Sequence, residues 1–147
     1  MKRRWRSTIF VLASSLMLFA KKDETIAEMK SRIDAVRPEE RISLAIQIAR
    51  KELDTVAEAN KSSNNEAAQA ALADLLAYAG KASDTSLQTN KKLKDTEIAL
   101  RKIAETLRDL KRSADFEQQA PLQNASERVE NMRTQLLTRM FGKKESR

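Results

Sequence analysis

The tract with the most evident capacity for chemistry is basic. Between residues 91 and 112 the chain holds eight cations and four acids. Lys94, Arg101 and Arg108 repeat every seven residues, so on a helix they would line one outer edge, which Lys91 and Arg112 would extend by a turn at each end. These five residues are the candidate anion-binding set, and the ligand would be an anionic cell-envelope polymer or lipid head groups.

A plainer interpretation of the same tract stays open. Glu97–Arg101 and Arg101–Glu105 have the i,i+4 spacing of helical ion pairs, each worth a few tenths of a kcal/mol, which is typical of a solvent-exposed face. Nucleic acid is not an expected partner, because no aromatic residue lies within the tract to stack on bases.

The residues that are missing exclude most enzymatic chemistry. The chain of 147 residues has no histidine and no cysteine. A Ser–His or Cys–His nucleophile pair, an HExxH zinc helix and a Cys/His metal cluster are therefore excluded. A carboxylate acid/base pair is the remaining option, but the acids are scattered and usually lie three or four positions from a cation. We expect no enzyme activity, no cofactor and no metal.

Helices must position these residues, because the chain has two glycines, two prolines and few aromatics, and is rich in Ala, Leu, Lys, Glu, Gln and Arg. Apolar residues predict a short helix over 26–36 and a second helix from Pro38 to about residue 60. From 64 to 113 one a/d heptad register runs without a break. Its members are Ala68, Leu72, Leu75, Ala79, Ala82, Ser86, Thr89, Leu93, Thr96, Leu100, Ile103, Leu107, Leu110 and Ala114.

We therefore predict an all-α fold of antiparallel helical hairpins, or a bundle, built around one long helix over about 64–113. Gly80 provides the alternative, a compact four-helix bundle broken at that residue, since glycine often follows a helix end. The register continues past Gly80, which favours the unbroken helix with a bend. The small a/d residues from 79 to 96 predict a gap between two hairpins, or alternatively a groove for a partner helix.

The last helix is predicted to follow Pro121 and to end at Gly142, with Phe116 packed under the preceding turn. The domain organisation is then a signal peptide over 1–20, a helical domain over 21–142 and a disordered basic tail over 143–147.

The N-terminal segment has the layout of a secretory signal peptide. Four cations in the first six residues precede an apolar run from Ser7 to Ala20, and Lys21-Lys22 follow. The fourteen-residue run would extend only ~21 Å as a helix, short of the ~30 Å hydrocarbon core of a bilayer. Without residues 1–20 the net charge falls from +7 to +3, with 24 basic and 21 acidic residues, so the high pI mostly reflects targeting.

The tract KKLKDTEIALRKIAETLRDLKR, then Phe116 and the ending LLTRMF, resemble a group of small exported bacterial helical proteins that have no assigned activity. The resemblance covers the C-terminal half. It implies a periplasmic or secreted helical protein, with no activity or ligand to transfer.

The function expected from the sequence is a non-enzymatic, exported helical scaffold or interaction protein of the cell envelope, with a protein partner or self-association. Two alternatives stay open: a helical rod tethered to the membrane by an uncleaved N-terminus, and a binder of an anionic envelope polymer through the 91–112 edge. Membrane attachment is expected only if the N-terminal segment is not cleaved.

Overall fold

The computed structural model describes residues 23–142, and in them the chain is all-α, without strands. The predicted signal peptide over 1–20 and the basic tail over 143–147 lie outside the described residues. The helices are α1 (Ile26–Arg32), α2 (Pro38–Lys61), α3 (Asn65–Thr89), α4 (Leu93–Ser113) and α5 (Phe116–Phe141).

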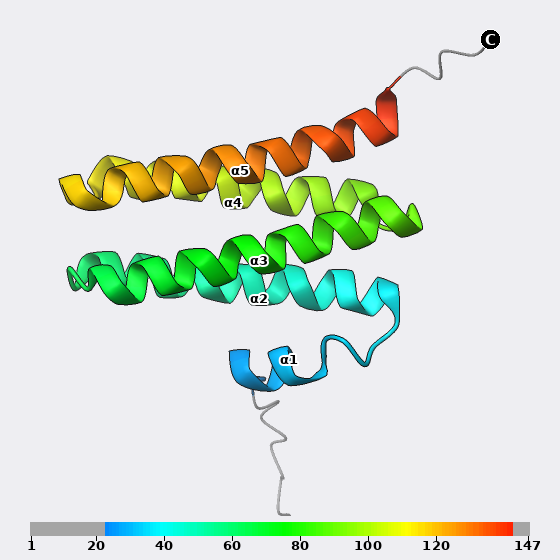
Figure 1. Cartoon of the computed structure of the whole chain (residues 1–147), viewed down its shortest axis with the longest axis horizontal. Helices are drawn as coiled ribbons and strands as arrows, with labels where there is room; N and C mark the ends of the chain where they lie inside the picture. Colours follow the sequence, from blue (N-terminus) through cyan, green and yellow to red (C-terminus); the bar gives the residue numbers. More distant parts are fainter. Residues whose placement is uncertain (1–22, 143–147) are drawn as a thin grey trace, which may run out of the picture.

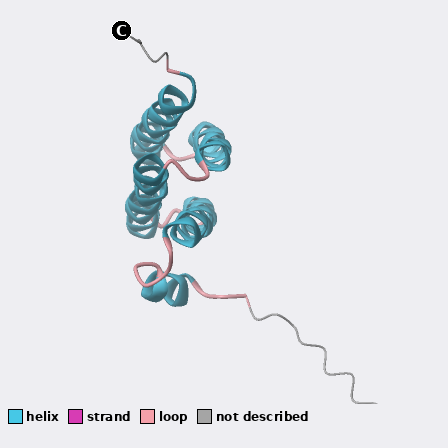
Figure 2. Ribbon diagram, turned by 90° about the vertical axis from the view of Figure 1, so that its right-hand side faces the viewer, coloured by secondary structure: helices cyan, strands magenta, loops and turns pink. Residues whose placement is uncertain are grey.

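Four of these helices form a bundle of two antiparallel hairpins, α2 with α3 and α4 with α5 (Figure 1). The chain alternates in direction from each helix to the next, so α2 and α4 are parallel to each other, as are α3 and α5. Seen from the side, α3 and α5 form one layer and α2 and α4 the other (Figure 2). The hairpins join mainly where α3 packs on α5. The prediction of antiparallel hairpins is therefore confirmed.

The buried residues form two clusters. The larger cluster joins the second half of α2 to α3, α4 and α5, with Leu75, Leu100, Leu107, Val129 and Leu136 among its fully buried members. The smaller cluster lies under α1 and contains Met29 and Ile33 packed with the first half of α2. Together the clusters account for the apolar stripes of all five helices.

α1 has only seven residues and depends on its contacts with the α2–α3 hairpin. Met29 and Ile33 supply the apolar contact. Lys30 Nζ lies 2.7 Å from Glu52 Oε1 on α2 and 2.6 Å from Asp74 Oδ2 on α3, and 5.4 Å from the centre of the Tyr78 ring. Burial lowers the pKa of Lys30, but the hydrogen bonds to Asp74 and Glu52 outweigh this effect and raise it. One side chain thus ties α1 to two other helices.

The single long helix predicted over 64–113 is wrong, and so is a break at Gly80. Gly80 lies inside α3, and the chain reverses at Asn90–Lys92 instead. Asn90 and Lys92 have left-handed backbone conformations, with φ of 57° and 51°. Asparagine adopts this conformation more readily than most residues, so the turn forms without glycine. Thr89 and Leu93 flank the turn four residues apart, which is an ordinary heptad step, and the register therefore shows no interruption.

The small residues of the predicted seam lie inside the bundle. Ala79, Ala82 and Ser86 of α3 and Thr96 of α4 are buried, and the Ser86 and Thr96 hydroxyls are hydrogen-bonded at 2.8 Å. They allow the two helices to approach closely beside the turn that connects them. The partner-helix groove predicted at this seam is therefore wrong, because the chain fills the space itself.

α5 begins at Phe116 rather than after Pro121. Pro121 lies in the second turn, where its missing N–H removes a single helical hydrogen bond. Phe116 is 88% exposed, so the prediction that it packs under the turn is wrong.

Candidate functional site

The five residues of the candidate anion-binding set lie on or next to α4. Lys94, Arg101, Arg108 and Arg112 are exposed on the helix itself, and we call these four the basic edge. Lys91 lies in the turn before α4, next to the start of α2, and is also exposed.

Ion pairs interrupt the basic edge. Arg108 Nη1 is 3.1 Å from Glu130 Oε1 on α5, and Arg112 Nη1 is 3.0 Å from Asp109 Oδ1 one turn away. Lys94 and Arg101 make no ion pair with another residue of the described part of the chain. Two separated cations on this edge therefore keep their charge available to a ligand.

Both ion pairs predicted from the i,i+4 spacing, Glu97–Arg101 and Arg101–Glu105, are wrong, because Arg101 makes no ion pair with a described residue. Glu97 is only 7% exposed, and its Oε1 lies 2.5 Å from Arg133 Nε on α5. Hydrogen bonds to Glu97 and then to Glu130 raise the pKa of the Arg133 guanidinium. Glu97 thus joins α4 to α5. The sequence contains one indication of this role: Glu97 follows Thr96, a residue of the apolar stripe, so Glu97 lies at the margin of the interface between the helices.

A second group of cations gathers where several helix ends meet. Lys91 Nζ lies 2.7 Å from Glu39 Oε1, and Lys92 Nζ donates a hydrogen bond to Ser43 Oγ at 2.6 Å, so the α3–α4 turn lies against the start of α2. Arg139 brings the end of α5 to the same turn. Arg37, directly before α2, lies near enough for its charge to act on Glu39, as that of Lys92 does. We call this group the basic end, and it consists of Arg37, Lys91, Lys92, Lys94 and Arg139.

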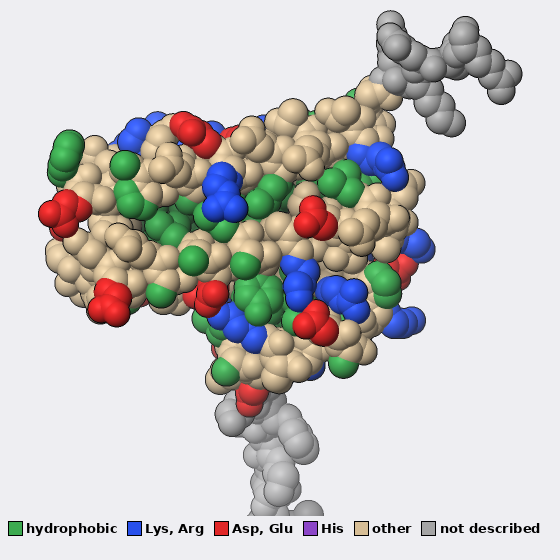
Figure 3. Space-filling model, in the orientation of Figure 1, with side chains coloured by type: hydrophobic (Ala, Val, Ile, Leu, Met, Phe, Trp, Pro, Cys, Tyr) green, Lys and Arg blue, Asp and Glu red, His purple; other side chains and the backbone are tan. Residues whose placement is uncertain are grey.

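Within the described residues, the Lys91–Glu39 pair is the salt bridge that the cations of the basic end make. The hydrogen bond from Lys91, together with its positive charge, lowers the pKa of the Glu39 carboxyl, and the same contact raises the pKa of Lys91. Both side chains are more than half exposed, so the pair adds little to stability. In Figure 3 the Lys and Arg side chains are most numerous toward this end of the visible face, while acidic side chains mark the opposite end.

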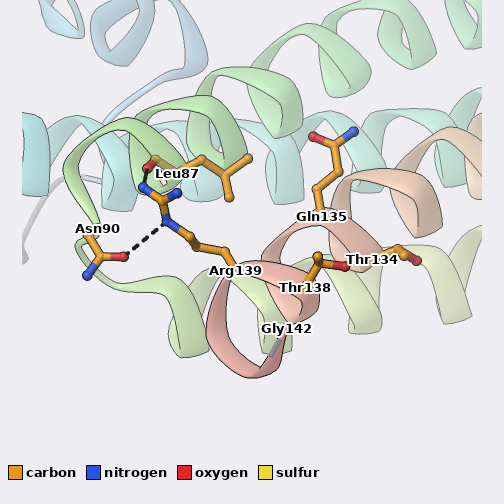
Figure 4. Close-up of a pocket in the computed structure, with 7 residues that line it drawn as sticks. All are labelled: Leu87, Asn90, Thr134, Gln135, Thr138, Arg139 and Gly142. Carbon is orange, nitrogen blue, oxygen red and sulfur yellow. Dashed lines mark hydrogen bonds between the residues drawn. The ribbon is translucent and has the colours of Figure 1, made fainter. Parts of the chain in front are cut away.

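A hollow of about 940 Å³ opens beside the basic end, between the last turns of α3 and α5 (Figure 4). Arg139 donates from Nη2 to the Leu87 carbonyl at 3.1 Å and from Nε to Asn90 Oδ1 at 3.4 Å. Both acceptors are neutral, so the guanidinium is held in place without being neutralised. The hollow contains no carboxylate, and its lining residues are Leu87, Asn90, Thr134, Gln135, Thr138, Arg139 and Gly142.

Two further hollows are grooves between neighbouring helices. One runs between α3 and α5 past Gly80 and Met132 and contains one carboxylate, Asp84. The other lies between α2 and α4 and also contains one, Asp95. Neither brings two acids together.

Among residues 23–142, two large apolar side chains are strongly exposed, one at each end of α5. Phe116, already noted, lies beside the α4–α5 turn, and Phe141, 77% exposed, lies at the basic end. The sequence predicted neither exposure, because Phe116 was expected to pack under the preceding turn and Phe141 continues the apolar stripe at the end of the last helix.

The described part of the chain shows neither a metal site nor a helix that could span a membrane. Within residues 23–142, no group of three or more acidic side chains is arranged to hold a metal ion. None of the helices in that range combines the length and the apolar character needed to cross a bilayer.

Comparison of the chain with protein-family models, with curated proteins and with solved structures gave no match.

Proposed function

We propose that this chain is an exported, non-enzymatic interaction protein of the cell envelope, and that the helical bundle is its working part. Residues 1–20 act as a signal peptide that is removed after Ala20, and the protein acts in the periplasm or outside the cell by binding a partner through its surface.

The observation that carries this proposal is the lining of the three hollows. Amides, hydroxyls, aliphatic groups and cations line them, and none holds more than one carboxylate. In a chain without histidine or cysteine, two facing carboxylates would be the simplest catalytic pair. The buried acids Glu52 and Glu97 instead pair with Lys30 and Arg133 and hold helices together. These features favour binding over catalysis.

A second candidate is the binding of an anionic envelope polymer along the basic edge. It is supported by Lys94 and Arg101, which have no acidic partner in the described part of the chain. A polymer bound along this edge would be attracted electrostatically by both cations. Replacing both by Gln should then lower the salt concentration at which the protein elutes from an immobilised polyanion, while Arg112→Gln, which removes an already paired cation, should change it less.

The membrane-tethered rod, in which the N-terminal segment is retained, is distinguished from the main proposal by an intact-mass measurement. The full chain is produced in a bacterial host and the protein is recovered from the periplasm and the medium. We expect a mass that corresponds to residues 21–147, and we expect Ala20→Phe to retain the segment, because signal cleavage requires a small residue there. Intact full-length chain in the cytosol would contradict export, and full-length chain in the membrane fraction would favour the tethered rod.

A further inference from the structure

The basic end has an excess of positive charge that the bundle does not neutralise. Its five cations face three nearby acids: Glu39, which pairs with Lys91, Glu40 beside it, which pairs with Arg32, and Asp95, which lines the groove beside Lys92. Arg139 is held by neutral oxygens, and Lys94 makes no ion pair with a described residue. An anionic partner therefore has accessible cations from α2, the α3–α4 turn, α4 and α5 on one surface.

Phe141 adds an apolar group to the same surface. A phenylalanine that is 77% exposed leaves most of its ring in water, so a partner that covers the ring gains the free energy of burying it. A soluble polyanion has no apolar region that could bury this ring. A lipid surface can bind both groups, because its headgroup phosphates attract cations and an aromatic side chain can insert at its acyl boundary.

The opposite end of the bundle provides an internal comparison. There the two hairpin turns contact each other through Ser63–Asp115 at 3.1 Å and Asn65–Glu117 at 3.0 Å. Its exposed aromatic, Phe116, lies between the acids Asp115 and Glu117, and the nearby cations Arg112 and Lys61 are paired with acids of their own helices. Of the two ends of the described bundle, the basic end is the one where cations outnumber acids around the exposed aromatic, whereas acids outnumber cations around Phe116.

We propose that the basic end docks on an anionic lipid surface, with Phe141 inserted at the acyl boundary and the cations on lipid phosphates. The Arg139 hollow accepts one headgroup phosphate, which a guanidinium can bind through two parallel hydrogen bonds. This contact is peripheral, and it requires no membrane-spanning segment. It rests on the proposed envelope function, because it names the partner class of that same protein.

Vesicle co-sedimentation tests this proposal. The protein is residues 21–147, which contain every member of both buried clusters and so retain the packed core. Vesicles are made of phosphatidylcholine alone or mixed with phosphatidylglycerol. We expect binding only to the anionic vesicles, and weaker binding as salt is added.

Matched variants locate the contact. Phe141→Ser should lower partitioning into anionic vesicles by about tenfold, since the ring is then absent from the acyl boundary. Replacing Lys91, Lys92 and Lys94 together by Gln should lower it by at least about tenfold. Phe116→Ser and Lys61→Gln, at the opposite end, should leave it unchanged. Circular dichroism checks that every variant keeps its helices, which is expected because all these side chains are exposed.

Three results would overturn the proposal. The first is that the protein does not bind anionic vesicles. The second is that the Phe116 and Phe141 variants lose vesicle binding equally. The third is that the protein binds soluble dextran sulfate as tightly as it binds vesicles, and that Phe141→Ser does not change this binding. The last result would favour the polymer instead. If vesicle binding fails while the exported protein has the mass of residues 21–147, lipid docking is wrong and export stands.

Discussion

At the scale of single residues, Asn90 and Lys92 determine how the molecule folds back on itself. Their left-handed backbone reverses the chain and sets α4 antiparallel to α3. The heptad pattern correctly identified Leu75, Leu100 and Leu107 as core residues, because burial depends on the period of the apolar positions. It could not identify the reversal, because three turn residues fit within one heptad step. Local backbone geometry, rather than hydrophobic period, decides such a turn.

Gly80 is a residue whose replacement should stabilise the protein. It lies inside α3, and a Cβ built there would lie 3.7 Å from Met132 Cε, an ordinary van der Waals distance. We expect Gly80→Ala to raise the free energy of unfolding by about 0.5–1 kcal/mol, because alanine loses less backbone entropy in a helix. Urea denaturation measures the change. Ala77→Gly, one turn earlier on an exposed position of α3, is the matched control and should lower the free energy of unfolding by a similar amount. A loss of stability in Gly80→Ala would contradict the continuous α3.

Arg133 is expected to be the most sensitive charged residue of the α4–α5 interface. Its removal leaves the nearly buried Glu97 carboxylate without a partner. We expect Arg133→Gln to lower the free energy of unfolding by about 2–3 kcal/mol, somewhat less than for a fully buried pair, because Arg133 is a quarter exposed. In the double variant that also carries Glu97→Gln, part of the lost stability should be restored. Arg128→Gln, on an exposed position of the same helix, should change stability by less than about 0.5 kcal/mol. Equal effects of the two arginine substitutions would argue against the Glu97–Arg133 pair.

At the scale of elements, α1 is the least secured helix of the described part. It is short, and its attachment combines two buried side chains with ion pairs at the surface. One of these pairs joins Asp34, just after α1, to Lys81 of α3 at 2.7 Å. The hydrogen bond and charge of Lys81 lower the pKa of Asp34, and a hydrogen bond from Arg32 lowers the pKa of Glu24 before α1.

These shifts predict that α1 loosens in acid. A carboxyl whose pKa is lowered by folding stabilises the folded state above its unfolded pKa, and this contribution is lost as pH falls through the folded value. Below about pH 4 the Asp34 and Glu24 contacts should therefore weaken. Amide hydrogen exchange, corrected for its intrinsic pH dependence, should show lower protection of α1 at about pH 3 than at neutral pH, with α4 around Leu100 still protected. Unchanged α1 protection, or parallel opening of α4, would contradict this assignment.

At the scale of the whole molecule, the alternation of helix direction creates the basic end. It brings the start of α2, the end of α3, the start of α4 and the end of α5 together. The sequence placed Lys91 and Lys94 among candidate ligands because they are close in the chain. It could not add Arg37 or Arg139, which lie about fifty residues away and join the others only through the bundle topology. Arg108 and Arg112 were predicted for the same site but lie toward the other end, in ion pairs.

Hydrogen exchange on vesicles is the sharpest test of whether this molecule acts through the basic end at an anionic surface. Exchange of residues 21–147 is compared on phosphatidylcholine vesicles and on vesicles that also contain phosphatidylglycerol. We expect slower exchange, on the anionic vesicles only, at the α3–α4 turn around Lys91 and at the end of α5 around Phe141. Slower exchange at the opposite end around Phe116, or no difference between the two vesicle types, would contradict it.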